Sequence, residues 1–177
     1  YFFVGLLVLM GAADLAFHLA LLGVLDLPAR PGLQAGLDVI LFVMAVMGGR
    51  VIPMFTNNGV PGANARRHAT VEKLALGSTL LLLIADVLPV PAPALAAVAL
   101  ACAVAHGARL ALWDSRKTFG TPLVWILHVG YGWLGVGLLL LGGAALDPGL
   151  VPRSAGIHAL TAGAVGVMTL AVMTRAT

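Results

Sequence analysis

The chain has 177 residues, of which 60% are hydrophobic and only 10% are charged, and its mean hydropathy is +1.04. A soluble globular domain usually carries about a quarter of its residues as Asp, Glu, Lys or Arg. The ten Lys and Arg and seven Asp and Glu present here cannot cover a soluble surface of this size. The composition therefore excludes a disordered chain, a nucleic-acid-binding module and an ordinary cytosolic enzyme, and it indicates a membrane protein.

Six segments are apolar and long enough to cross a bilayer, whose hydrocarbon core of about 30 Å takes roughly 20 helical residues. In chain order they cover residues of about 2–25, 34–55, 71–88, 94–113, 122–145 and 155–175. Hydrocarbon offers no hydrogen-bond partner to the backbone, so each segment is expected to be a helix. We predict an all-α, polytopic transmembrane bundle that occupies residues 1–177 as a single region.

Lys and Arg are distributed unequally between the two sides of this bundle. Eight of them fall on one side, namely Arg50, Arg66, Arg67, Lys73, Arg109, Arg116, Lys117 and Arg175, and only Arg30 and Arg153 fall on the other. The positive-inside rule places the first side, and both ends of the chain, in the cytoplasm. The basic pI of about 9.6 then reports membrane topology, so we expect a lipid bilayer and no nucleic acid as partner.

Ionisable side chains are costly inside a bilayer and are usually functional there. Asp14 and His18 lie four residues apart in the first span, so they share one helix face. A carboxylate beside an imidazole can orient a metal-ligating histidine or relay protons. A packing hydrogen bond between helices is the third interpretation that the sequence leaves open.

The fourth span places Cys102, His106 and Arg109 along one stripe. Cys and His four residues apart can bind a soft metal such as copper, although a buried cysteine is also a common core residue. Arg109 can extend to the interface or meet an acidic group.

The fifth span carries His128 on the same face as Gly132 and Gly135, with Tyr131 one turn away. A histidine above a glycine strip leaves a flat slot in which a planar cofactor could lie against the backbone. The alternative is that the glycines pack against another helix, as they often do in membranes.

Four histidines fall at two depths in the predicted bundle. At 1.5 Å per residue, His18 and His158 lie about 10 and 5 Å inside the outer end of their helices. His106 and His128 each lie about 10 Å from the cytoplasmic side, on adjacent antiparallel helices. We predict metal ligands among these four residues, arranged as an outer and an inner pair. Arg50, Arg66 and Arg67 form a cationic rim on the cytoplasmic side that could hold an anionic group or anchor the helices.

Three segments together resemble the NnrS family, membrane proteins associated with the response to nitric oxide. They are MGGRVIPMFTNN (Met47–Asn58), PLVWILHVGYGWL (Pro122–Leu134) and HALTAGAVGVMTLAVMTRA (His158–Ala176). The resemblance implies a multi-pass protein of the bacterial inner membrane with twelve helices, of which this chain is a central portion. Its motif residues are Arg50, Pro53, His128, Tyr131, His158 and Arg175.

The resemblance also implies haem and copper as cofactors, nitric oxide as the small ligand, and a redox partner whose identity is unknown. Imidazoles from several helices would hold a metal in an apolar pocket that uncharged nitric oxide reaches through lipid. Asp14, Tyr131 and Arg50 would then support the ligands or relay protons. Arg66, Arg67 and Arg109 would either meet haem propionates or belong to the cytoplasmic rim. Whether nitric oxide is turned over, sensed or resisted stays open, so no enzymatic activity is assigned.

Two other functions compete with this one. A proton-coupled transporter would use Asp14, His18, Arg50 and Asp86 along a polar pathway. In the third interpretation the polar residues only hold helices together.

Overall fold

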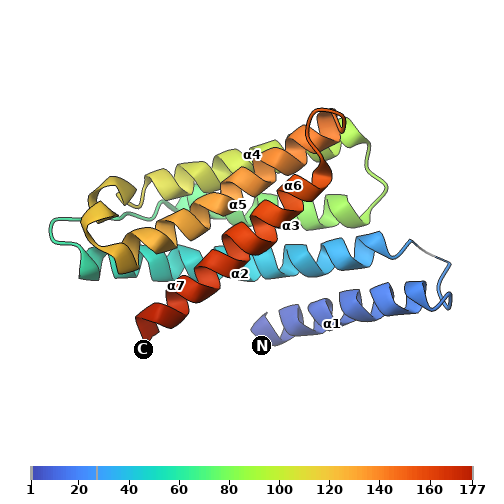
Figure 1. The fold of residues 1–177 in the computed structure, drawn as a ribbon, viewed down its shortest axis with the longest axis horizontal. Coiled ribbons are helices and arrows are strands. Elements are labelled where there is room, and N and C mark those ends of the chain that lie inside the picture. The colour runs from blue at the N-terminus through green and yellow to red at the C-terminus, as the bar shows by residue number, and fades with distance from the viewer. Residues whose placement is uncertain (1, 27, 177) are drawn as a thin grey trace.

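The computed structural model describes residues 2–26 and 28–176, and it confirms the all-α architecture (Figure 1). The first five long helices are α1 (Phe2–Leu21), α2 (Arg30–Gly59), α3 (Ala69–Val87), α4 (Ala92–Ala111) and α5 (Pro122–Leu146). A short 3₁₀ helix, η1 (Ser115–Gly120), precedes α5. The last helix has three consecutive parts, namely α6 (Arg153–His158), the π-helical segment η2 (Ala159–Gly166) and α7 (Val167–Ala176).

The connections between helices alternate between two ends of the bundle (Figure 1). The α2–α3 and α4–α5 connections lie at one end, which we call the basic end because it carries Arg66, Arg67, Arg116 and Lys117. The other three connections lie at the opposite end, the far end, where Arg30 and Arg153 begin α2 and α6. The cations are therefore grouped in space as the sequence predicted.

Among the described residues, five helices are long and apolar enough to cross a membrane, which is one fewer than the six predicted. They are α1, α2, α4, α5 and the continuous region Arg153–Thr174. The segment 71–88 does form a helix, α3, but it is not one of these five, which corrects the predicted number of spans. It carries Glu72, Lys73 and Asp86 within 19 residues, and charges of this kind are expensive in hydrocarbon.

Helix α2 is longer than predicted by four residues at each end. Pro31 stands in its first turn, where its missing amide hydrogen has no helical acceptor to lose. At the other end Thr56 is fully buried and Asn57 exchanges hydrogen bonds of 2.7 and 3.0 Å with the backbone of Ala65. Packing thus keeps a polar sequence helical beyond the apolar stretch.

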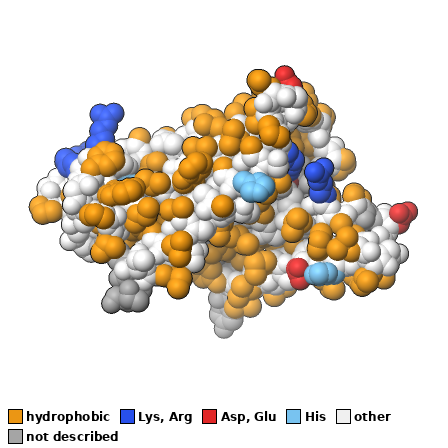
Figure 2. All heavy atoms as spheres, in the orientation of Figure 1, with side chains coloured by type: hydrophobic (Ala, Val, Ile, Leu, Met, Phe, Trp, Pro, Cys, Tyr) orange, Lys and Arg blue, Asp and Glu red, His pale blue; other side chains and the backbone are white. Residues whose placement is uncertain are grey.

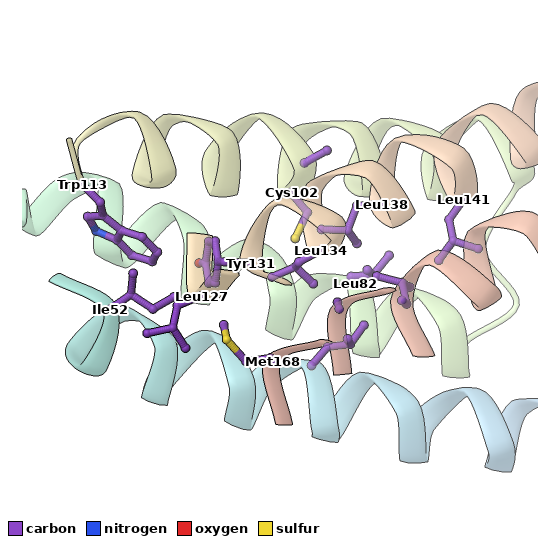
Figure 3. Close-up of a cluster of buried hydrophobic side chains, with 14 of the residues drawn as sticks. Ile52, Leu82, Cys102, Trp113, Leu127, Tyr131, Leu134, Leu138, Leu141 and Met168 are labelled. Carbon is purple, nitrogen blue, oxygen red and sulfur yellow. The ribbon is translucent and has the colours of Figure 1, made fainter. Parts of the chain in front are cut away.

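Helix α5 is the centre of the bundle and contacts α2, α4, η1 and all parts of the last helix. Its buried residues recur at spacings of four and three, which places them on one helix face. They are Leu127, Tyr131, Leu134, Leu138 and Leu141, and Figure 3 shows them in line along the core. Helix α1, in contrast, contacts chiefly α2, and only 6% of its apolar window is buried within the chain.

The loops at the basic end are tied together across 50 residues of sequence. The Asp114 carboxylate accepts hydrogen bonds from the backbone N–H of Asn64 at 3.1 Å and from the Lys117 ammonium group at 2.9 Å. The hydrogen bond from Lys117 lowers the pKa of the Asp114 carboxyl. Asp114 has a φ of 55°, a left-handed conformation that aspartate tolerates better than most residues.

Glycines let α5 and the last helix approach closely, and this contact gives a stability test. A Cβ at Gly137 would lie 2.6 Å from the Leu160 side chain and 3.1 Å from its backbone nitrogen. Gly137→Val is therefore expected to destabilise the bundle by about 1–3 kcal/mol through overpacking. The matched control is Gly135→Val, because nothing lies within 4 Å of a Cβ there. Thermal unfolding of the purified protein in detergent measures both, and equal midpoints would contradict the packing.

Candidate functional site

A polar stripe runs along α3 and organises the interior of the bundle. Glu72, Thr79 and Asp86 are seven residues apart, or about two helical turns, so they lie on the same face. Glu72 bonds to Arg109 of α4, and Thr79 bonds to His106 of the same helix. Asp86 bonds to Arg153 at the start of α6. The face of α3 that would be costly in lipid is thus turned toward other polar groups.

Arg109 is the most deeply buried cation, with 1% of its surface exposed. Its Nε donates to Glu72 at 2.7 Å and its Nη2 donates to the second oxygen of the same carboxylate. Its Nη1 donates to the Ala45 carbonyl at 2.6 Å and to the Tyr131 hydroxyl at 2.9 Å. All three guanidinium nitrogens are therefore engaged, so the predicted contact with a haem propionate would require Arg109 to give up these partners.

The two consecutive glycines of the Met47–Asn58 segment make room for this network. A Cβ at Gly49 would collide with the guanidinium of Arg109. A Cβ at Gly48 would lie 3.2 Å from the ring of Tyr131, tighter than an ordinary contact. The glycine pair on α2 therefore forms the surface against which Arg109 of α4 and Tyr131 of α5 pack.

The hydrogen bonds from Arg109 run in one direction and fix the protonation of His106. The Tyr131 oxygen accepts from Arg109, so its own proton goes to His106 Nδ1 at 2.6 Å. The Thr79 hydroxyl donates to the Ala75 carbonyl at 2.8 Å, so it accepts from His106 Nε2 at 2.9 Å. His106 is therefore a neutral imidazole with its proton on Nε2 and no uncommitted nitrogen.

His128 is engaged at both nitrogens in a similar way. Thr56 donates its proton to the Ile52 carbonyl at 2.8 Å and accepts from His128 Nε2 at 2.8 Å. His128 Nδ1 pairs with the Ser115 hydroxyl at 2.9 Å. In the glycine strip beside His128, a Cβ at Gly132 would meet Leu110 at 3.7 Å, whereas nothing lies within 4 Å of a Cβ at Gly135.

Trp113 joins the two inner histidines through aromatic contacts. Its ring lies 4.6 Å from that of Tyr131 and 6.3 Å from that of His128, and Tyr131 in turn lies 5.6 Å from His106. Figure 3 shows Trp113 and Tyr131 facing one another between the helices. The Trp113 indole nitrogen is buried without a hydrogen-bond partner among the described residues. The predicted inner pair is therefore one packed unit, bridged by two aromatic rings.

The outer histidines are placed differently, because both are exposed within this chain. His18 Nε2 lies 3.5 Å from the Asp14 carboxylate, so the predicted pair on one face of α1 is formed. His158 Nδ1 donates to the Ser154 carbonyl at 2.7 Å. In the described part of the chain the other nitrogen of each ring has no hydrogen-bond partner. Figure 2 shows exposed histidine side chains among hydrophobic ones on this face of the molecule.

A cavity of about 900 Å³ opens at the far end between α1, α2, the α3–α4 connection and the last helix. Phe17, next to His18, lines it from α1, and Ile157, next to His158, lines it from α6. Its polar wall residues include Asp14, Arg30, Gln34, Asp86, Arg153 and Thr161. The residues that neighbour the two outer histidines thus share one cavity.

The remaining predicted site residues are not brought together. Arg50, Arg66 and Arg67 are exposed, and Arg67 lies 3.4 Å from Glu72 at the edge of the network. Cys102 is fully buried, and its sulfur lies 3.6 Å from the Thr79 hydroxyl. The side chain of Arg175 falls outside the part of the chain that the structure describes. Within that described part, no group of three or more His, Cys, Asp or Glu side chains is placed to hold a metal ion.

Sequence reasoning missed Glu72, Thr79, Thr56 and Ser115 as partners of the predicted residues. A signal for the first two was present, because the spacing of Glu72, Thr79 and Asp86 marks one polar face on an otherwise apolar helix. No comparable signal existed for Thr56, which pairs with a residue 72 positions away.

Apolar helices around a buried polar network define a polytopic helical membrane protein. A family model described as NnrS protein matches residues 1–177. The chain therefore belongs to the NnrS family, which confirms the resemblance carried by its three motifs. No curated protein and no solved structure matches the chain.

The ion pair of Arg109 with Glu72 gives the second test. Glu72→Gln leaves a buried guanidinium without a counter-charge, which is expected to cost about 3–5 kcal/mol of stability. Arg67→Gln removes only the exposed partner of the same carboxylate, and we expect a loss of no more than about 1 kcal/mol. Thermal unfolding in detergent compares the two variants. The double variant Glu72→Leu with Arg109→Leu should lose less stability than Glu72→Gln alone. If its loss equalled the sum of the losses for Glu72→Leu and Arg109→Leu measured separately, a direct pair would be contradicted.

Proposed function

We propose that this protein binds haem and copper in the bacterial inner membrane and acts in the response to nitric oxide, with its basic end in the cytoplasm. Membership of the NnrS family and the apolar helices support the membrane setting. The distribution of Lys and Arg between the two ends supports the orientation. The proposal includes a longer, twelve-helix protein whose other helices contribute to the metal sites.

The observation that carries the proposal is the hydrogen bonding of the four predicted imidazoles. His158 donates Nδ1 to a backbone carbonyl, which fixes the tautomer that leaves Nε2 as a ligand. His18 stands beside a carboxylate, the other common partner of a metal-bound imidazole. His106 and His128 would each have to break a hydrogen bond of 2.9 Å or less before binding a metal. We therefore assign ligand roles to the outer pair and a structural role to the inner pair.

The far-end cavity fits the cofactors as a partial site. Its wall includes Phe17 and Ile157, the sequence neighbours of the two outer histidines, and Arg30 in the same wall can neutralise an anionic group such as a propionate. His18 and His158 fit as single ligands, each completed by donors from elsewhere, since the described residues hold no closed set. Haem iron or copper, when bound, supplies the centre to which nitric oxide binds. The chain itself orients the imidazoles and surrounds them with apolar groups that uncharged nitric oxide can cross.

Absorption spectra of the purified full-length protein, oxidised and reduced with dithionite, test this assignment. We expect a Soret band that is lost or shifted in His158→Ala or His18→Ala. His68→Ala, in the exposed α2–α3 loop, should leave the band unchanged. A colourless, folded protein would refute haem binding. A band lost only when His106 or His128 is replaced would place the ligands in the inner pair instead.

Proton-coupled transport is a second candidate, and one observation favours it. Asp14 of α1 and Asp86 of α3, both predicted for that pathway, line the same far-end cavity. Arg50, the third predicted charge, is exposed on the half of α2 nearer the basic end. Substrate-driven proton uptake into proteoliposomes by a colourless protein would support transport over cofactor binding.

A further inference from the structure

Asp38 is a buried carboxyl group that neither cofactor binding nor the packing of α5 explains. It lies on α2 with 1% of its surface exposed. Its Oδ1 accepts a hydrogen bond from the Gln34 amide at 3.2 Å, whereas its Oδ2 is buried without a partner. An ionised carboxylate needs several donors once it is removed from water, and this one has a single, long one.

The charges near Asp38 balance one carboxylate, that of Asp86, but not a second one on Asp38. Asp86 of α3 lies 3.0 Å from Arg153 of α6, and its side chain is only 5% exposed. Arg153 also donates to the side-chain oxygen Oε1 of Gln34 at 3.1 Å, so the Gln34 side chain bridges the cation and Asp38. One cation therefore serves two buried carboxyl groups. If Asp38 carries a proton, the cluster of Asp38, Asp86 and Arg153 is neutral, which is the less costly state in an apolar surrounding.

The other ionisable groups on the surrounding helices do not change this ratio of one cation to two carboxyl groups. Helix α4 contributes the buried thiol of Cys102, and its His106 and Arg109 are engaged in the network toward the basic end. Helix α1 contributes Asp14 and His18, which are exposed and pair with each other. The ionisable groups of α5, His128 and Tyr131, are engaged in the network toward the basic end. Arg30 begins α2, eight residues or about 12 Å along the helix from Asp38.

The cluster has access to one end of the bundle only. Gln34, Asp86 and Arg153 line the far-end cavity, so the hydrogen-bond partner of Asp38 and the neighbouring ion pair both border it. Toward the basic end the polar stripe of α3 is interrupted by Leu82, which is buried between Thr79 and Asp86. Figure 3 shows Leu82 within the hydrophobic core cluster.

We propose that Asp38 is a proton-binding site that exchanges with the far-end cavity through the pair of Asp86 and Arg153. In the loaded state the Asp38 carboxyl group is neutral and Arg153 balances Asp86. On release, the O–H bond of Asp38 breaks, the proton passes to water in the cavity, and Arg153 is shared between two carboxylates. The site shares the far-end cavity with the proposed cofactors, but it involves none of their proposed ligands.

Infrared spectroscopy of the full-length protein in lipid, with aspartate labelled by carbon-13, tests the proposal. A protonated aspartic acid gives a carbonyl band that shifts with the label and with deuterated water. We expect such a band in the wild-type protein at neutral pH and its loss in Asp38→Asn. Asp147→Asn, an exposed carboxylate in the α5–α6 loop, should leave the band unchanged.

Two further variants keep the test decisive even if Asp38→Asn does not fold. Asp86→Asn frees Arg153 to pair with Asp38, so the band should weaken or disappear. Arg153→Gln removes the shared cation, so a second protonated carboxyl group should appear. A wild-type protein without the band, a band that Asp38→Asn leaves intact, or a band abolished by sodium would overturn the proposal, the last by identifying a cation site.

Discussion

The ion pair between Arg109 and Glu72 is the interaction on which the rest of the interior depends. A guanidinium with 1% exposure must find an anion and hydrogen-bond acceptors within the bundle. Glu72 supplies the charge, and it is one of the three charged side chains of α3. The same requirement explains the glycine at position 49, since any larger residue on α2 would occupy the space of the guanidinium.

The orientation of Arg109 propagates to the inner histidines. Because Arg109 donates to Tyr131, the Tyr131 proton is directed to His106, and His106 is held as one tautomer. Trp113 packs against both Tyr131 and the Arg109 guanidinium, which lies 5.6 Å from its ring centre. Hydrogen bonding thus separates two kinds of histidine that look alike in the sequence. Both ring nitrogens of each inner imidazole are hydrogen-bonded within the network, whereas each outer imidazole has one ring nitrogen without a hydrogen bond among the described residues.

Helix α3 divides the polar interior into two parts. Glu72 and Thr79 belong to the network near the basic end, and Asp86 belongs to the cluster at the far end. Leu82 separates them, so no continuous line of hydrogen bonds joins the two ends among the described residues. Buried polar groups are stable only when their partners are present. Among the described residues, the buried side-chain atoms without a partner are the Trp113 indole nitrogen and Oδ2 of Asp38, and the second of these is the basis of the proton site that we propose.

Hydropathy alone located the six long helical regions to within four residues at either end but not the short helix η1, and the placement of Lys and Arg predicted which ends lie together. The position of each histidine along its helix also followed from the sequence, but His18 lies in the last turn of α1 and not at the predicted 10 Å, because α1 ends at Leu21. The sequence could not identify Glu72 as the partner of Arg109, since the two are 37 residues apart and meet only when α3 packs on α4. For the same reason it could not distinguish His106 from His158. The availability of a ring nitrogen depends on neighbours from other helices, and only the tertiary structure decides which neighbours are present.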